Sequence, residues 1–141
     1  MTDDQVVDIS RRGILSFDEA YERVLVLKRL TGRYAEWVER RMIQLESLSP
    51  NQLDLIHQIE SEINELIHEW HGKVRRLAGT PKGLWLVDFD AGFGYYCWKF
   101  PEAELSYWHN YNEGFDKRKK ITVDEENEFV FSGRNIVSLK L

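Results

Sequence analysis

The chain has 141 residues, a formal net charge of −5, 43% hydrophobic residues and 30% charged residues. These values are those of one globular domain with a single core, and the acidic balance argues against a general nucleic-acid binder. No apolar run approaches the roughly 20 residues that a membrane-spanning helix needs. The single cysteine, Cys97, excludes an internal disulfide framework, and the acidic N-terminus lacks a signal-peptide pattern, so we expect a cytoplasmic protein.

The first strong structural signal follows a short polar stretch, which we expect to be an N-terminal arm over residues 1–15. Ser16 and Glu19 have the spacing of a capping box, which predicts a helix that begins at Phe17. From there to about Glu46, apolar residues recur at alternating steps of four and three. That spacing is typical of one long amphipathic helix.

A second helix is predicted directly after the first. Ser49, Pro50 and Gln52 form another helix-start pattern, and the apolar spacing then continues until Ala78 and Gly79. Because the connection is so short, the two helices must lie antiparallel. The sequence therefore predicts a long antiparallel helical hairpin over residues 16–79.

The apolar faces of both predicted helices are wider than a two-helix seam needs. The C-terminal sheet, a second copy of the chain, or both would cover them, and we expect a homodimer that forms a four-helix bundle. Arg41 and Glu60 occupy seam positions about one turn apart, which predicts a partly buried pair or a pair that reaches across the dimer. Ile63 and Trp70 are the apolar seam candidates. Glu65 and His68 have a metal-ligand spacing but point to solvent.

After Lys82 the hydrophobic period changes to that of strands. Residues 84–90, 95–100 and 105–111 read as an antiparallel meander, and residues 128–131 with 136–141 read as a final hairpin. We therefore predict one α+β domain over residues 1–141, in which the helical hairpin packs against an antiparallel sheet over residues 83–141.

Pairing the three strands across their loops separates an apolar face from a polar one. The polar face would carry Asp88, Cys97 and Trp108 in one row, with His109 at the edge of the other face, opposite Tyr96. The apolar face would hold eight core side chains: Trp85, Val87, Phe89, Tyr96, Trp98, Phe100, Leu105 and Tyr107.

Several short motifs in this region resemble a known family. They are Gly83-Leu84, Val87-Asp88-Phe89, Cys97-Trp98-Lys99, Tyr107-Trp108-His109, Glu113-Gly114-Phe115 and Arg118. After a long helical hairpin, this series resembles an uncharacterised family of small bacterial proteins known only as a domain of unknown function. The resemblance covers about Ser16 to Ile121 and implies no activity. In that family Leu-Val-Asp-Phe follows the glycine directly, so the intervening Trp85-Leu86 predicts a bulge or a shifted strand start.

The polar face of the sheet is the candidate ligand site. Its residues are Asp88, Lys99, Trp108, His109, Glu113 and Arg118. A carboxylate, an imidazole and a guanidinium beside an aromatic wall can bind a small anionic or planar ligand. The alternative is structural, with an ion pair between Asp88 and Arg118 and one hydrogen bond from His109. Cys97 reads as a small buried hydrophobe. The sequence assigns no catalytic residue, metal or cofactor.

Three function classes are consistent with these features. The first is a non-catalytic binding or scaffolding protein that self-associates through its hairpin and offers the sheet face to a ligand or a protein partner. The second is a small enzyme that acts on an anionic molecule with Asp88, His109, Glu113 and Arg118. The third is a contact with single-stranded nucleic acid through the basic run Lys117 to Lys120, although the net charge disfavours it.

Overall fold

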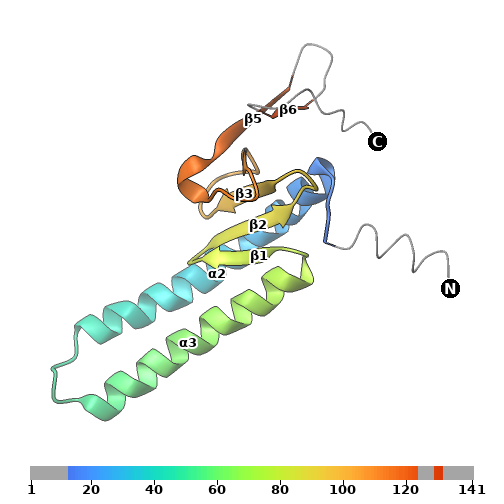
Figure 1. Ribbon diagram of the computed structural model, residues 1–141. Helices are drawn as coiled ribbons and strands as arrows, with labels where there is room; N and C mark the ends of the chain where they lie inside the picture. The colour runs from blue at the N-terminus through green and yellow to red at the C-terminus, as the bar shows by residue number, and fades with distance from the viewer. Residues whose placement is uncertain (1–12, 124–128, 132–141) are drawn as a thin grey trace.

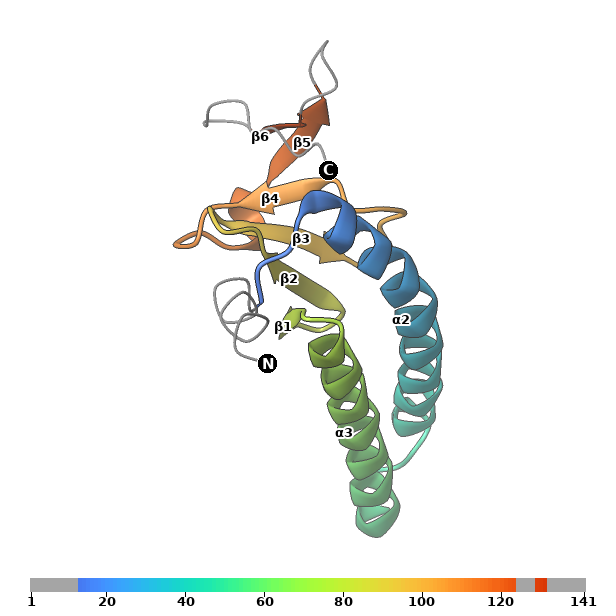
Figure 2. The ribbon, with the colours of Figure 1, turned by 90° about the vertical axis from the view of Figure 1, so that its right-hand side faces the viewer.

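The computed structural model describes residues 13–123 and 129–131, and its fold is α+β as predicted. Figures 1 and 2 show the two helices side by side, projecting from the sheet so that only their sheet-proximal ends contact it. In chain order the elements are α2 (Phe17–Glu46), α3 (Leu53–Arg76), β1 (Thr80–Gly83), β2 (Leu86–Asp90), β3 (Tyr95–Lys99), β4 (Tyr107–His109), the 3-10 turn η1 (Phe115–Lys117), β5 (Lys119–Val123) and β6 (Phe129–Phe131).

The start of α2 is the capping box that the sequence predicts. The Ser16 backbone N–H donates to Glu19 Oε1 at 2.8 Å, and the Glu19 N–H donates to Ser16 Oγ at 3.2 Å. The last residue of the predicted arm, Leu15, is bound to the sheet. The Leu15 N–H donates to the Asp90 carbonyl at 2.8 Å, and its side chain is buried. Residues 1–12 of that arm lie outside the described residues.

The second helix begins later than its sequence pattern suggests. The Ser49 backbone N–H donates to Gln52 Oε1 at 2.9 Å, and the Gln52 N–H donates to the Ser49 carbonyl at 3.1 Å. These bonds close a separate turn, and α3 begins after it at Leu53, with Gln52 as the N-cap. The residues of the expected capping box therefore form a turn in the connection between the helices and do not cap α3.

The end of α3 is a Schellman motif. The Ala78 N–H donates to the Arg75 carbonyl and the Gly79 N–H to the Val74 carbonyl, both at 3.0 Å. The left-handed residue is Ala78, with φ of 64°, rather than the glycine. A Cβ on Gly79 would lie 2.7 Å from Val87 Cγ1, so this glycine is needed for close packing of α3 on the sheet.

Each strand of the sheet pairs antiparallel with the next one along the chain, in the order β1 to β6. The edge strand β1 is missing from the sequence-based expectation. Pro81 lies in it, which an edge strand tolerates because one side needs no hydrogen bonds. The predicted strand start at Leu84 was wrong, since Leu84 and Trp85 form the β1–β2 turn, with a φ of 61° at Trp85.

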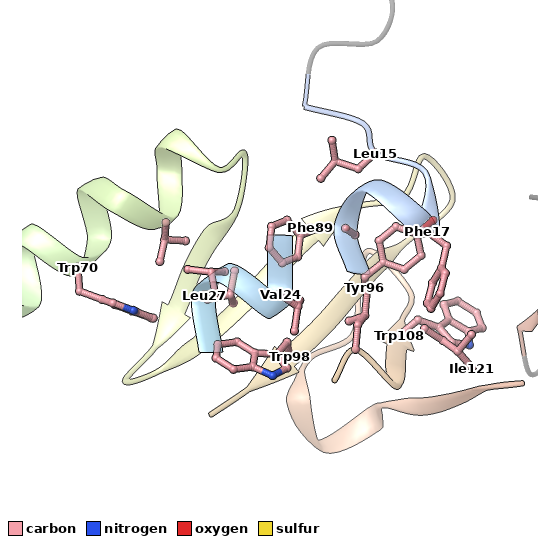
Figure 3. Packing of buried hydrophobic residues seen from close by; sticks show 14 of the residues in the cluster. Leu15, Phe17, Val24, Leu27, Trp70, Phe89, Tyr96, Trp98, Trp108 and Ile121 are labelled. Atoms are coloured by element: carbon pink, nitrogen blue, oxygen red, sulfur yellow. The ribbon is translucent and has the colours of Figure 1, made fainter. Parts of the chain in front are cut away.

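The core lies between the N-terminal half of α2, the C-terminal end of α3 and one face of the sheet. Val87 pairs with Trp98 and Phe89 with Tyr96, which confirms the predicted register of β2 and β3. Figure 3 shows the α2 side chains that meet them. Ten residues of the core cluster are labelled in it: Leu15, Phe17, Val24, Leu27, Trp70, Phe89, Tyr96, Trp98, Trp108 and Ile121.

The predicted register of β4 was wrong by one residue. Cys97 pairs with Tyr107, Tyr96 with Trp108, and Tyr95 with His109. A slip of one residue exchanges the two faces of a strand, so Trp108 joins the core while Tyr107 and His109 move to the polar face. The cause is the connection between β3 and β4, which runs from residue 100 to residue 106 and is longer than the four residues expected.

The basic run also differs from the expected exposed turn, because its second half belongs to β5. Of the final predicted hairpin, the structure describes Phe129–Phe131, which pairs with β5 as β6. Its expected partner, residues 136–141, lies outside the described residues.

Replacing Gly79 by Ala is expected to destabilise the protein by about 1–3 kcal/mol, because the new methyl group would overpack the contact between α3 and the sheet. Gly72→Ala is the matched control. A Cβ there meets nothing within 4 Å, and alanine should stabilise the helix by about 0.5–1 kcal/mol. Urea unfolding of both variants measures these changes. Equal effects in the two variants would contradict the packing role of Gly79.

Candidate functional site

The register of β4 brings three polar side chains together on the face of the sheet opposite the core. Asp88 of β2 pairs with Cys97 of β3, and these two share a face with His109 of β4. The sequence-based register had put His109 on the other face. All three side chains are buried, with exposed fractions of 2%, 0% and 2%. We call these residues the Asp88–Cys97–His109 cluster.

The cluster is compact enough for its polar atoms to act together. His109 Nε2 lies 3.1 Å from Asp88 Oδ2, and His109 Nδ1 lies 2.8 Å from the carbonyl oxygen of Asn110. One donor atom from each of the three residues, the Cys97 Sγ included, lies within 4.8 Å of the others. This spacing is that of atoms that can contact one common small ligand or ion.

The hydrogen bonds of His109 determine which of its nitrogens carries a proton. A carbonyl oxygen only accepts, so Nδ1 must be the donor to Asn110. In the neutral ring the lone pair is then on Nε2, which faces a carboxylate oxygen of Asp88. The other oxygen, Asp88 Oδ1, is buried without a hydrogen-bond partner among the described residues. In the neutral ring, Asp88 Oδ1 and His109 Nε2 are thus acceptors of the cluster, and the Cys97 thiol beside Asp88 is its donor.

Cys97 is buried as the sequence predicts, but its neighbours are polar. Burial, and then the nearby Asp88 carboxylate, raise the pKa of the Cys97 thiol far above its ordinary value, while Arg118 lowers it by a smaller amount. The thiol is therefore protonated at neutral pH unless a cation joins the cluster.

Arg118 closes one side of the cluster, although it does not pair with Asp88 as expected. It forms a two-bond pair with Glu102, from Nη1 to Oε1 at 3.0 Å and from Nη2 to Oε2 at 2.8 Å. Its guanidinium stacks between the rings of Tyr107 and Phe115, 4.2 and 4.1 Å from their centres. Burial disfavours the charge, but the Glu102 carboxylate outweighs it and raises the pKa of Arg118.

Glu113 belongs to a separate contact at the edge of the sheet. Its Oε1 accepts from Lys119 Nζ at 2.7 Å and from the Asn110 backbone N–H at 3.2 Å, and the Lys119 bond is the main cause that lowers the pKa of Glu113. Lys99 donates to the Leu84 carbonyl at 3.4 Å, away from the cluster. Of the predicted site residues, only Asp88 and His109 are in the cluster. Glu113 and Arg118 form ion pairs with Lys119 and Glu102, and Trp108 belongs to the core.

Aromatic side chains cover the other side of the cluster. The Tyr95 ring packs on His109 at 5.6 Å and on Tyr111 at 4.9 Å between ring centres. The Tyr111 hydroxyl donates to Asp90 Oδ1 at 2.6 Å, which fixes the loop after β4 over the sheet. The cluster is therefore enclosed by the loop after β4 and by the Arg118 stack.

The basic run offers less free charge than its sequence suggests. Arg118 and Lys119 are paired with Glu102 and Glu113, whereas Lys117 and Lys120 are exposed. Two exposed lysines on an acidic chain are an ordinary surface feature, and the ring of Phe115 in the same turn is already stacked on the Arg118 guanidinium.

The residues predicted for the helical seam lie in different environments. Arg41 Nε donates to Glu62 Oε1 at 3.1 Å, so the expected partly buried pair with Glu60 is not formed within the chain, and Glu60 is exposed. A pair of Arg41 and Glu60 across a dimer stays a prediction. The Trp70 indole N–H donates to Thr31 Oγ1 at 2.8 Å inside the core. Ile63 is half-buried between the helices.

Comparison with known proteins gives a family but no activity. The model of the uncharacterized conserved protein family DUF2203 matches residues 14–121. The chain belongs to the DUF2203 family. No curated protein and no solved structure matches it. In the described part of this DUF2203 protein, neither helix is long and apolar enough to cross a membrane.

Sequence reasoning missed Glu102 as a site residue. Besides pairing with Arg118, Glu102 Oε1 accepts the Lys99 backbone N–H at 2.8 Å, so it connects the end of β3 to the end of η1. An acidic residue three positions after Lys99 in a tight connection is a signal for such a bond. Its partner Arg118, which directly follows η1, could not be predicted without the fold.

Proposed function

We propose that this DUF2203 protein is a small non-catalytic binding protein that forms a dimer through its helical hairpin and holds a ligand in the Asp88–Cys97–His109 cluster. The buried and unpaired Asp88 Oδ1 carries the ligand half of this proposal. A buried acceptor without a donor costs about 1–3 kcal/mol, and a bound ligand would remove that cost. The unpaired Cys97 thiol supports a reducing compartment, which we propose is the cytoplasm.

A binding role fits the cluster better than acid–base catalysis. Glu113 and Arg118, which an enzyme would need beside Asp88 and His109, are each engaged with another residue. The three cluster side chains are enclosed rather than open to a substrate. An enclosed, buried cluster suits the retention of a small ligand or ion more than the turnover of a substrate that must enter from solvent.

The exposed apolar surface of the hairpin supports the dimer half. Of the eleven large apolar side chains that are exposed in the described part of the chain, seven lie on α2 and α3. Val26 and Trp37 are 54% and 39% exposed, whereas Leu30 is partly buried and packs against the core. Exposed apolar side chains on a projecting hairpin are typical of a surface that a second helix pair covers.

The charges of the two helices support a particular arrangement of the copies. Residues 23–35 of α2 carry four basic residues and no acidic one, whereas residues 54–69 of α3 carry five acidic residues and no Lys or Arg. The basic stretch is near the sheet and the acidic stretch is near the tip of the hairpin. An antiparallel two-fold dimer places the acidic stretch of each copy against the basic stretch of the other.

A native mass spectrum of the untagged protein taken directly from cells tests both halves. We expect a species of twice the 16.8 kDa chain mass, with one reproducible added mass per chain. In Asp88→Asn, which keeps the side-chain shape but removes the charge, the added mass should be lost while the dimer remains. A dimer without added mass would refute the ligand half, and a monomer would refute the dimer half.

Charge exchange between the helices tests the arrangement of the dimer. The variant R29E/R33E should raise the dimer dissociation constant by about tenfold or more, and so should E60R/E65R, because like charges then face each other. An equimolar mixture of the two should restore a heterodimer, since each interface regains opposite charges. Sedimentation velocity measures all three samples.

The variant K117E/K120E is the matched control, because it reverses two exposed charges away from the hairpin. It should leave the dissociation constant unchanged. If the mixture stays monomeric while each parent variant folds, the antiparallel arrangement is wrong.

A further inference from the structure

We infer that the Asp88–Cys97–His109 cluster binds one divalent transition-metal ion of the zinc class, held by one oxygen, one sulfur and one nitrogen atom. This inference rests on the ligand half of the proposed function and names the ligand. It is independent of the dimer half.

The set of donor atoms determines the class of metal. Carboxylate, thiolate and imidazole together suit zinc, cobalt and similar transition metals, whereas calcium and magnesium take oxygen ligands. One donor atom from each residue lies within 4.8 Å of the other two, which is the separation that ligands of a single ion have. Three protein ligands also leave one tetrahedral position, which a water molecule or the second Asp88 oxygen can fill.

His109 is held in the orientation of a metal-binding histidine. Its Nδ1 donates to the Asn110 carbonyl at 2.8 Å, and this hydrogen bond leaves the Nε2 lone pair directed into the cluster. Histidines that bind metals through one nitrogen nearly always donate the other N–H to a carbonyl or carboxylate, which fixes the tautomer and the ring. Arg118 and Glu102, next to the thiol, provide the corresponding outer contacts on the sulfur side.

A metal ion satisfies more of the cluster than a proton does. A second proton on the ring would join Nε2 to Asp88 Oδ2 across their 3.1 Å separation, but it would leave the buried Oδ1 without a partner. A divalent ion accepts electron pairs from nitrogen, oxygen and sulfur together. It also balances the negative charges of the carboxylate and the thiolate in a buried site.

Burial of the cluster implies that the metal enters as the sheet forms. The ligands come from three strands, β2, β3 and β4, so they meet only when the sheet is complete. On binding, the Cys97 thiol transfers its proton to solvent and the sulfur–metal bond forms, with no change in oxidation state. The metal should therefore stabilise the folded protein against heat.

Cobalt(II) is the probe that tests this site. The full chain is unfolded in denaturant with a chelator, freed of both, and refolded with cobalt(II) or zinc(II) alone. We expect one metal ion per chain, a higher melting temperature, and, with cobalt, a sulfur-to-metal charge-transfer absorption band. Because Cys97 is the only cysteine of the chain, that band reports on this site even without a variant.

Variants separate the site from adventitious binding. Cys97→Ser should abolish the band, and His109→Gln should weaken binding by more than the ~10–100-fold that the loss of an outer hydrogen-bond partner costs. His68→Gln is the matched control, since His68 is exposed on α3 beside Glu65, and it should leave both band and affinity unchanged. Circular dichroism checks that each variant folds.

Two results would overturn the inference. One is wild-type protein that refolds with cobalt yet shows no sulfur band, and the other is zinc stabilisation that persists in Cys97→Ser. Either result, with an organic added mass in the native spectrum, would leave the proposed binding function intact and remove only the metal. The absence of any added mass and of any metal would remove both.

Discussion

The contact between His109 Nε2 and Asp88 Oδ2, 3.1 Å apart and shielded from water, is the interaction on which our account of the site depends. Both atoms carry lone pairs when Nδ1 holds the ring proton, so the contact is stable only with a positive centre between or beside them. The rest of the site surrounds that pair. Cys97 supplies a third donor atom, and Arg118 with its Glu102 partner closes the sulfur side.

The protein has two parts, a helical hairpin that projects from the sheet and a sheet whose loops enclose the Asp88–Cys97–His109 cluster. The hairpin extends away from the sheet and carries seven exposed large apolar side chains, whereas the sheet and its loops bury three polar residues. Gly79 joins the two parts, because its missing side chain lets α3 approach Val87 and Phe89 closely. A site in the sheet and an interface on the hairpin can therefore act independently.

Local signals in the sequence were sufficient for the helices and for one strand pair. The capping box at Ser16 and the spacing of apolar residues are properties of a few neighbouring residues, so α2 is predicted to its ends. The β2–β3 register also follows from the sequence, since the connection is a short hairpin with clear polar and apolar faces.

The site could not be predicted because its signal is not local. Tyr107 and Trp108 are both aromatic, so the pattern of polar and apolar residues could not show which of them faces the core. The long connection before β4 removed the geometric constraint that fixed β3. With a register that was wrong by one residue, His109 was predicted on the face opposite Asp88 and Cys97. The three proposed metal ligands were therefore not predicted to lie together. The partners of Arg118 and Arg41 were missed for the same reason, since ion pairs depend on tertiary positions.

The protonation of the His109 ring is the most direct test of this account. A long-range proton–nitrogen NMR spectrum, recorded on the protein refolded without metal and again with one equivalent of zinc, distinguishes the two ring nitrogens. We predict that Nδ1 is protonated in both samples, and that the Nε2 resonance moves to that of a metal-bound nitrogen when zinc is added. A proton on Nε2 in both samples, unchanged by zinc, would show a simple pair with Asp88 and contradict the metal site.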